Sequence, residues 1–347
     1  MTNVASENNS VSLFELLRCP EVKTVPDPLL TVLGSNAKGE PVICDLRSAV
    51  HLLAAGKKDT GVSDCVHSII CSLLHRASSE EVKLVLIDPG DRGMRDLYCG
   101  AKHLLYPVIV DDEKAAGTMA QILQEMDARY ERLRQAEVRS IVKYCQSIKD
   151  TDAKMPYIVV VLNELADLMK TRKNETERFL HKAGTLGRAA GIHIVAATQE
   201  PTEDVLTGII RNSIPARAVF SVDDKKTSRL VIDAEGAEKL TDPGEMFYKE
   251  ACMIPVQANV CSLSPAEIVS SVSFRDILKE AAEYAVKEGK ISTSMLQRKF
   301  AVGYARAGRL MDQLEQLGVI GQADGAKPRK ILMTEEEYRR RFMADEP

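Results

Sequence analysis

Two glycines and a hydroxyl side chain are the first residues in the chain whose types and spacing could do chemistry. Gly56 and Gly61 are separated by four residues, and Ser63 stands two positions after the second glycine. This is the spacing of a phosphate-binding loop, in which backbone N–H groups hold phosphates, a lysine neutralises them and a hydroxyl binds Mg²⁺. The lysine position holds Val62. The spacing therefore predicts a loop shaped for a nucleotide that lacks its main cation.

The loop between the two glycines is Lys57, Lys58, Asp59 and Thr60. With these residues, the candidate nucleotide-binding set runs from Gly56 to Ser63. Asp59 and Asp64 add negative charge where a triphosphate would lie, which opposes its binding. Two glycines alone are a weak signal, so an inert strand–turn–helix that has kept its shape is the alternative. Lys57 or Lys58 could reach back to replace the missing lysine, although both stand early in the loop.

A second candidate group follows two other apolar segments. In nucleotide hydrolases an aspartate at the end of such a strand orients Mg²⁺, and a following glutamate polarises the attacking water. This chain has Asn163 and Glu164 there, so the candidate metal ligands, Ser63 and Asn163, include no anion. Glu164 is a candidate base or simply an acid near the start of a helix. Gln199 is a candidate γ-phosphate sensor or a polar strand end.

These side chains require a sheet that brings several strand ends together. Apolar runs predict strands over Pro41–Asp45, Glu81–Asp88, Tyr157–Asn163, Ile192–Gln199 and Ala216–Val222. Helical periodicity appears over Val66–Leu74, Lys114–Val138 and Glu177–Gly191. Because strands alternate with helices, we expect an α/β domain with a mainly parallel sheet and helices on both faces.

The sequence changes character near its C-terminal end. A serine-rich stretch, Ser262–Ser273, reads as a linker. Beyond it we predict helices over Phe274–Glu288, Ser292–Phe300 and Val302–Leu317, then a strand pair, Val319–Gly321 with Lys330–Met333. This is the plan of a winged helix-turn-helix, whose third helix reads DNA. The candidate DNA-binding residues are Arg298, Lys299, Tyr304, Arg306, Arg309, Lys327, Arg329 and Lys330. A solvated basic surface is the alternative.

Composition describes an ordinary globular protein. Of 347 residues, 45% are hydrophobic and 28% charged, and the net charge of −4 means that a nucleic-acid surface must be local. The eight cysteines include no CxxC pair, which disfavours zinc and disulfide frameworks. No apolar run approaches the roughly 20 residues of a membrane span, and the first residues lack a signal-peptide pattern. We therefore expect a cytoplasmic protein without a membrane segment.

Together these segments resemble the motor module of FtsK-type DNA translocases, the hexameric RecA-like pumps that move chromosomal DNA at bacterial division. The matching segments include HLLAAG, VKLVLIDP, PYIVVVLNELADLM, GRAAGIHIVAATQEP and GAEKLTDPGEMFY. The segment LQRKFAVGYARAGRLMDQLEQLGVIG resembles the family's C-terminal winged helix. The resemblance runs from about Pro28 to Leu332, without the family's membrane-spanning N-terminal part.

The resemblance implies five parts of the chain. These are an N-terminal extension (1–27), a RecA-like P-loop motor domain (28–261), a linker (262–273), a winged-helix DNA-binding domain (274–335) and a C-terminal tail (336–347). It also implies ATP and Mg²⁺ as cofactors, although their binding is in question here. Double-stranded DNA is the implied partner, and a ring of identical subunits or a mixed ring with an active motor is the implied assembly.

The departures from the family fall on charged positions. The loop lysine is Val62, the magnesium aspartate is Asn163, the arginine after the Thr-Gln pair is Glu200, the lysine after the Asp-Pro pair is Gly90, and an asparagine of the recognition helix is Ala305. The retained residues are Gly56, Gly61, Ser63, Glu164, Gln199 and Arg217. This pattern favours a DNA-binding homologue with impaired ATP hydrolysis, acting in DNA partitioning or as a non-hydrolysing subunit. The alternatives are an active ATP-dependent translocase and a DNA-binding regulator that uses the α/β domain only to oligomerise.

Overall fold

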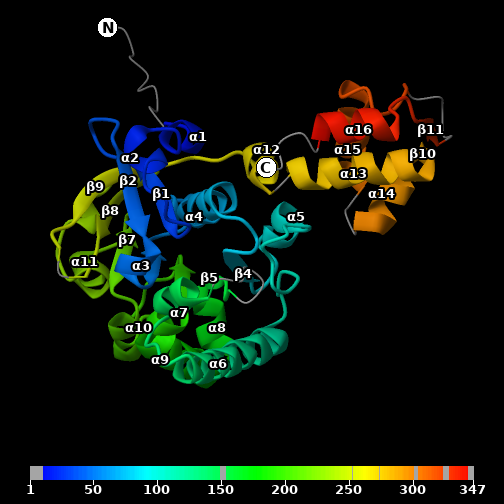
Figure 1. The fold of residues 1–347 in the computed structure, drawn as a ribbon. Helices are drawn as coiled ribbons and strands as arrows, with labels where there is room; N and C mark the ends of the chain where they lie inside the picture. The colour runs from blue at the N-terminus through cyan, green and yellow to red at the C-terminus, as the bar shows by residue number, and fades with distance from the viewer. Residues whose placement is uncertain are drawn as a thin grey trace, which may run out of the picture. The chain divides into compact units, whose positions relative to one another are not determined.

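The computed structural model describes residues 11–148, 154–251, 253–272, 274–300, 304–322 and 328–342. The chain divides into two compact units. The first comprises residues 1–95 and 103–268, and the second comprises residues 96–102 and 269–347. Figure 1 shows the elements of both.

A nine-stranded sheet, with the order β2-β1-β9-β8-β7-β3-β6-β5-β4, forms the centre of the described part of the first unit (Figure 1). The strands are β1 (Leu30–Ser35), β2 (Pro41–Asp45), β3 (Leu52–Ala55), β4 (Val82–Ile87), β5 (Tyr157–Asn163), β6 (Ile192–Thr198), β7 (Ala216–Val219), β8 (Glu245–Lys249) and β9 (Val256–Val260). The run from β7 to β4 is parallel. The pairs from β7 to β2 are antiparallel, and of the strands in this extension the sequence patterns predicted only β2.

Helices cover both faces of this sheet because the parallel strands are apolar on both faces. The first unit contains α1 (Leu13–Leu16), α2 (Pro20–Lys23), α3 (Leu46–Ala49), α4 (Val62–Arg76), α6 (Asp112–Gln135), α7 (Ile141–Ser147), α8 (Leu165–Thr171), α9 (Lys173–Ala190), α10 (Gly208–Ser213) and α11 (Lys225–Ile232). The boundary between the two units falls within α5 (Met94–Tyr98). One core cluster joins the α6, α8 and α9 helices to alternate residues of β3, β5 and β6.

The α4 helix is tied to the outer strand β1 by buried serines. Ser68 Oγ donates to the carbonyl of Val32 over 2.7 Å, and the Val32 N–H donates to Ser72 Oγ over 3.1 Å. The pairing of β1 with β2 shifts register between Val32 and Gly34, so these hydroxyls satisfy backbone groups at the irregularity. The middle of α4, the helix whose first turn forms part of the candidate nucleotide site, is thereby held to the sheet.

The second unit has its own core and the elements of a winged helix-turn-helix. These are α13 (Phe274–Glu288), β10 (Lys290–Ile291), α14 (Thr293–Phe300), α15 (Tyr304–Gln316), β11 (Arg329–Lys330) and α16 (Glu335–Phe342). The β10 and β11 strands pair antiparallel, and Ile320 bridges to Ile331. The expected fold class, a mainly parallel α/β domain with a small C-terminal winged helix, is confirmed.

Two segments differ from their sequence descriptions. The predicted linker contains the α12 helix (Pro265–Ser271). The predicted tail is helical over most of its described part, because α16 continues to Phe342. Tyr338 of α16 is 2% exposed and packs in the core of the second unit, so this contact holds the helix against the core. Among the described residues, no helix is both long and apolar enough to cross a membrane.

Two buried histidines lie at the amino ends of the central strands. His51 Nδ1 accepts from the N–H of Ile194 over 3.0 Å, and its Nε2 lies 3.3 Å from the carbonyl of Gly184. Since a carbonyl can only accept, Nε2 carries the proton and the ring is neutral. Burial lowers the pKa of His51 to about 3 and that of His193 to about 4.

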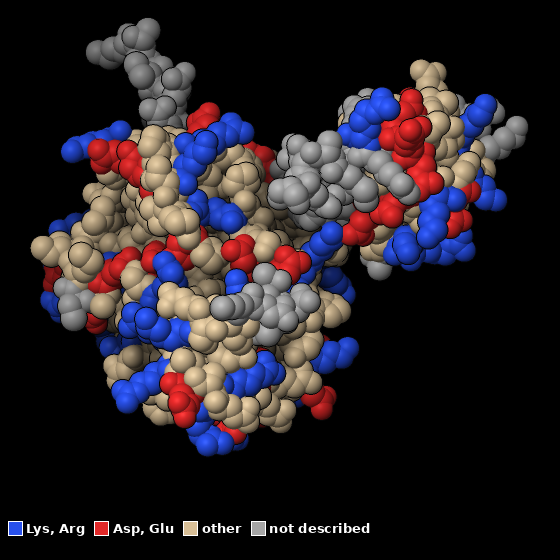
Figure 2. Space-filling view, in the orientation of Figure 1, with Lys and Arg blue, Asp and Glu red and all other residues tan. Residues whose placement is uncertain are grey.

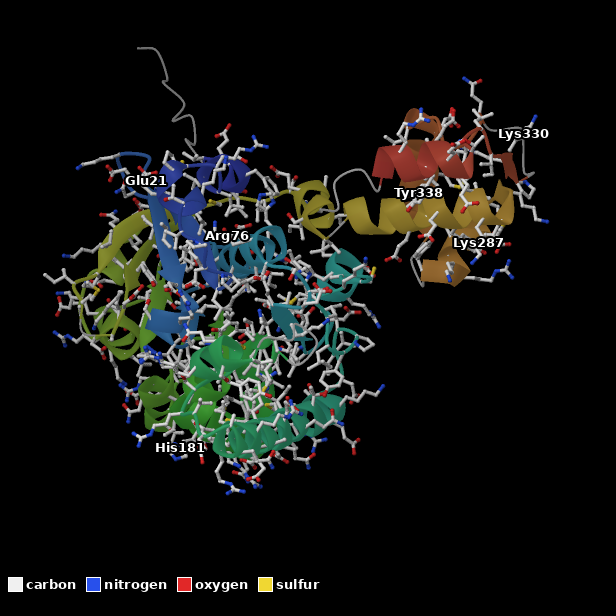
Figure 3. All side chains as sticks on the ribbon, viewed as in Figure 1. Glu21, Arg76, His181, Lys287, Lys330 and Tyr338 are labelled. Atoms are coloured by element: carbon white, nitrogen blue, oxygen red, sulfur yellow. The ribbon has the colours of Figure 1, made fainter. Side chains whose placement is uncertain are left out.

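We predict from these histidines a loss of stability in mild acid. Below pH 6.5 these two imidazoles bind protons in the unfolded chain but not in the folded chain. The free energy of unfolding therefore falls as the pH drops towards 4. Each histidine should contribute a loss of about 2 kcal/mol between pH 7 and pH 5, measured by urea unfolding. Replacement of His193 by Gln should reduce this loss, whereas replacement of the exposed His181, labelled in Figure 3, should not. An equal loss in all three proteins would contradict the prediction.

Candidate nucleotide site and nucleic-acid interface

The glycine loop lies where β3 ends and is anchored to the strands on either side. The N–H of Gly56 donates to the carbonyl of Thr198 at the end of β6 (3.3 Å). The N–H of Lys57 donates to the carbonyl of Ser221, just beyond β7 (2.8 Å). Inside the loop, Thr60 Oγ1 donates to the Lys57 carbonyl over 2.6 Å. The loop is therefore held in one shape without any bound ligand.

Phe220 explains why both glycines are needed. A Cβ atom on Gly56 would lie 2.5 Å from the Cβ of Phe220, and one on Gly61 would lie 2.8 Å from its Cε1. Gly61 also has a φ of 115°, a conformation that side chains rarely adopt. The N–H groups of residues 58–61 have no hydrogen-bond acceptor among the described residues. They are available to hold an anion, and the α4 helix begins directly after them.

The position of the missing lysine is apolar, and the cations of the loop are Lys57 and Lys58. Val62 is only 3% exposed, so its side chain belongs to the protein interior. Lys57 Nζ lies 3.4 Å from the carboxylate of Asp223, which directs it away from the loop. Lys58 is exposed. Partial burial raises the pKa of Asp64, which follows the hydroxyl residue of the loop.

Glu164 is buried and its carboxylate receives three donors. Its Oε1 accepts from Thr198 Oγ1 over 2.8 Å and from the N–H of Ala166 over 3.3 Å, and its Oε2 accepts from the N–H of Gln199 over 3.1 Å. It is 5% exposed and caps the start of α8 with a φ of 71°. These contacts are those of a capping acid that also holds the end of β6. Its role as a base remains a prediction.

Gln199 and Ser63, which the sequence analysis considered separately, lie beside each other. Gln199 Nε2 donates to Ser63 Oγ over 3.2 Å, so the sensor candidate contacts the hydroxyl that would bind a metal. The neighbouring Glu200 pairs with Lys170 over 2.7 Å. The end of β6 is thus connected both to the glycine loop and to α8.

Asp88 is a site residue that the sequence analysis did not single out. It follows β4, is fully buried, and its Oδ1 accepts from Asn163 Nδ2 over 2.7 Å. Its Oδ2 accepts from the N–H of Met94 over 3.1 Å. The signal in the sequence that could have identified Asp88 is an acidic residue directly after a buried strand. The Asn163 amide carries no charge, but it donates to the Asp88 carboxylate. An aspartate at position 163 would instead repel that carboxylate.

These residues fit a triphosphate better than they fit Mg²⁺. The free N–H groups of residues 58–61 and the start of α4 could hold phosphate oxygens. For Mg²⁺ the site offers the Ser63 hydroxyl and the Asn163 amide oxygen, while Asp88 already accepts two hydrogen bonds. A hard cation prefers carboxylate ligands. Among the described residues no cluster of three or more His, Cys, Asp or Glu side chains could hold a metal.

The candidate DNA-binding residues of the second unit fall into three groups. Arg298, Lys299 and Lys330 are exposed, and Lys299 Nζ lies 5.6 Å from the centre of the Tyr284 ring. Arg329 pairs with Glu315, so its charge is partly used within the unit. Tyr304, Arg306 and Arg309 lie on α15, but their side chains are outside the described set, as is the whole of Lys327.

The first unit does not show a cluster of basic side chains on the face drawn in Figure 2. On the face drawn in Figure 2, its basic and acidic side chains are interspersed. This face shows no broad basic surface of the kind that non-specific DNA binding requires. Any nucleic-acid contact made by this side of the first unit would therefore be local.

Family models match most of the chain. The model of the FtsK/SpoIIIE family matches residues 12–203, and that of the Ftsk gamma domain matches residues 275–334. The DNA translocase FtsK of Caldanaerobacter subterraneus subsp. tengcongensis is 36% identical over 358 residues, which cover 95% of this chain and 50% of the relative. The DNA translocase SpoIIIE of Bacillus subtilis is 37% identical over 363 residues, with coverage of 94% and 46%. The chain thus spans about half the length of the curated relatives it matches.

Solved structures share the fold of the first unit at lower identity. The cytoplasmic domain of the type VII secretion ATPase EccC from Thermomonospora curvata has a TM-score of 0.64 and 22% identity, covering 77% of this chain and 34% of that one. The pCW3 conjugation coupling protein TcpA, in a monomer form with ATPγS, has a TM-score of 0.58 and 22% identity, covering 70% of each chain. These similarities concern the fold alone.

We predict that Asn163→Asp destabilises the protein, because it replaces the donor to Asp88 with a second carboxylate. The free energy of unfolding should fall by about 2–3 kcal/mol at pH 7, and by less at pH 5, where one of the two groups can take up a proton. Urea unfolding at both pH values measures this. The exchanged pair, Asp88→Asn with Asn163→Asp, restores one amide and one carboxylate and should recover most of the loss. No difference between the single and the exchanged variants would contradict the prediction.

Proposed function

Because the chain belongs to the FtsK/SpoIIIE family, we propose that it is a DNA-binding member whose nucleotide site has lost ATP hydrolysis. It acts in DNA partitioning, either as a ring of identical subunits or as a non-hydrolysing subunit beside an active motor. A chromosomal substrate implies a cytoplasmic location. The observation that carries the proposal is the buried Val62 at the position of the loop lysine.

The loss of the lysine removes charge stabilisation from the loop. Phosphoryl transfer depends almost entirely on positioning and on cations that neutralise the developing charge. In phosphoryl transfer, one arginine that stabilises the transition-state charge is worth about 10³–10⁵ in rate. Lys57 is paired with Asp223, and Asn163 gives a metal no anionic ligand. Two losses in one site would bring hydrolysis close to the background rate.

Nucleotide binding is a separate matter from hydrolysis. The free N–H groups of residues 58–61 and the start of α4 remain suited to phosphate oxygens. ATP held in this way would stabilise the first unit without being cleaved. The chain's own residues would then bind and orient the nucleotide, with Gln199 and Ser63 beside its outer phosphates.

An active ATP-dependent translocase is the second candidate. Two observations favour it. Gln199 donates to Ser63, and Glu164 lies at the end of β5, as a working site would need. In that case Glu164 would have to release part of its three hydrogen bonds to accept a proton from water. Lys58, which is exposed, is the remaining candidate to supply the missing charge.

We predict that the wild-type chain releases phosphate from ATP, in the presence of Mg²⁺ and duplex DNA, no faster than the Glu164→Gln variant. The double variant Val62→Lys, Asn163→Asp should exceed the wild-type rate by at least about tenfold, because it restores one cation and one anionic metal ligand. Folding of each variant is checked by circular dichroism.

DNA-stimulated phosphate release by the wild type, abolished by Glu164→Gln, would instead establish the active translocase. A Lys58→Gln variant serves as the matched control in that case. Loss of the activity in this variant would identify Lys58 as the substitute for the missing loop lysine.

We further predict that Arg298→Gln with Lys299→Gln weakens duplex binding and flattens its dependence on salt. Each lost phosphate contact should reduce the slope of log affinity against log salt concentration by about 0.9. Fluorescence anisotropy at several salt concentrations measures both quantities. Arg340→Gln on α16 removes an exposed charge elsewhere in the same unit and is the control. An unchanged slope in the double variant would mean that the duplex contacts another surface.

A further inference from the structure

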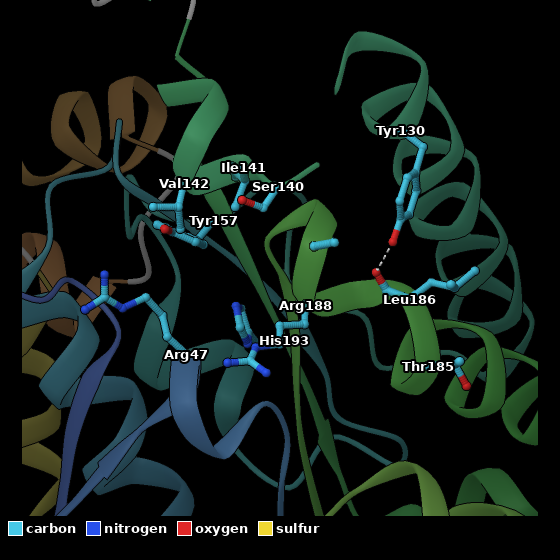
Figure 4. A pocket seen from close by; sticks show the side chains of 11 residues that line it. Arg47, Tyr130, Ser140, Ile141, Val142, Tyr157, Thr185, Leu186, Arg188 and His193 are labelled. Carbon is cyan, nitrogen blue, oxygen red and sulfur yellow. Dashed lines mark hydrogen bonds between the residues drawn. The ribbon is translucent and has the colours of Figure 1, made fainter. Parts of the chain in front are cut away.

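A cavity of about 460 Å³ lies in the first unit, well away from the glycine loop (Figure 4). Its lining includes Tyr157, which begins β5, and His193 near the start of β6. The candidate nucleotide site is built from the opposite ends of the same strands. Since β5 has seven residues, the two places are about 20 Å apart along the strand. The cavity is therefore separate from the nucleotide site.

Among the described residues, the charged side chains that line this cavity are Arg47 and Arg188. Arg188 is exposed and makes no hydrogen bond or ion pair through its side chain with any described residue. Arg47 pairs with the buried Asp27 and lies 3.9 Å from the carboxylate of Asp45, so its charge is balanced within the protein while part of its side chain remains exposed. Burial lowers the pKa of His193 to about 4, so the ring is neutral near pH 7 and the positive charge comes from the arginines.

Much of the remaining lining is apolar and lies on helices, and Ser140 and Thr185 add two hydroxyl groups. Ile141 and Val142 come from α7, and Leu186 and Ala189 come from α9. Val142 and Leu186 are among the exposed large hydrophobic residues of the described chain, at 37% and 41%. The hydroxyl of Tyr130 on α6 donates to the Leu186 carbonyl over 2.8 Å, drawn as a dashed line in Figure 4. This bond ties two of the helices that form the walls, so the cavity is formed before any ligand enters.

We propose that this cavity binds a small organic anion. The carboxylate or phosphate of the ligand lies at Arg188 and Arg47, and its aromatic or aliphatic body lies against Val142 and Leu186. The guanidinium of Arg188 can pair with the anionic group of such a ligand, and the exposed side chains of Val142 and Leu186 can contact its apolar body. The volume accommodates a ligand of one aromatic ring with a short charged arm. The site is independent of nucleotide binding at the glycine loop.

The test uses three probes of similar shape on the full chain, with binding followed by isothermal titration calorimetry. They are 3-phenylpropionate, phenyl phosphate and the uncharged 3-phenylpropionamide. Both anions should bind, with the amide at least about tenfold weaker because it lacks the charge that pairs with arginine. The tighter of the two anions identifies the preferred head group.

Two variants and one control locate the binding. Arg188→Gln should weaken both anions at least about fivefold and leave the amide unchanged. Ala189→Phe fills the cavity without changing charge and should abolish binding of all three probes, with Ala189→Leu as a smaller replacement if folding suffers. Arg178→Gln, an exposed arginine elsewhere on α9, should change nothing. Absence of binding to the folded wild type, or anion binding that survives both Arg188→Gln and the cavity-filling variant, would overturn the proposal.

Discussion

The buried carboxylate of Asp88 imposes the constraint on which the candidate site depends. A carboxylate without solvent must have donors, and the Asn163 amide and the Met94 N–H provide them. A second carboxylate at position 163 would need a cation between the two groups to be stable at neutral pH. The resemblance to the family places a lysine where this chain has Gly90. Relative to that resemblance, Gly90 removes one positive charge and Asn163 removes one negative charge, so the net charge near Asp88 is the same.

The same edge of the sheet has a well-defined shape, although it holds neither the lysine nor the aspartate that the family resemblance leads us to expect. The glycine loop is held by Thr198 and Ser221, and Phe220 occupies the space that any side chain at Gly56 or Gly61 would need. The carboxylate of Glu164 stabilises the end of β6 and the start of α8. These contacts are structural and do not depend on hydrolysis. A protein that uses this domain to bind DNA or to assemble therefore has reason to retain them.

The sequence predicted the elements whose signals are local and strong. β5 and α13 have the bounds expected from a continuous apolar run and from a clear helical period. β8 and β9 were missed because they are short, and β9 has three exposed residues, so their hydrophobic patterns are weak. Gln199 and Ser63 were each singled out from the sequence, but their contact was not predicted. The Asp88–Asn163 bond and the arginine-lined cavity depend on side chains distant in sequence, which local patterns do not relate.

The central claim is that this site has lost the charges that hold metal and phosphate, and the magnesium dependence of nucleotide affinity tests it most directly. Isothermal titration with ATPγS, with and without Mg²⁺, separates backbone binding from binding through a metal. We predict that Mg²⁺ changes the dissociation constant by less than about twofold, because neither of the two candidate metal ligands, Ser63 and Asn163, is an anion. A tightening of about tenfold or more by Mg²⁺ would contradict this claim, since it would show that the metal is still held between the protein and the phosphates.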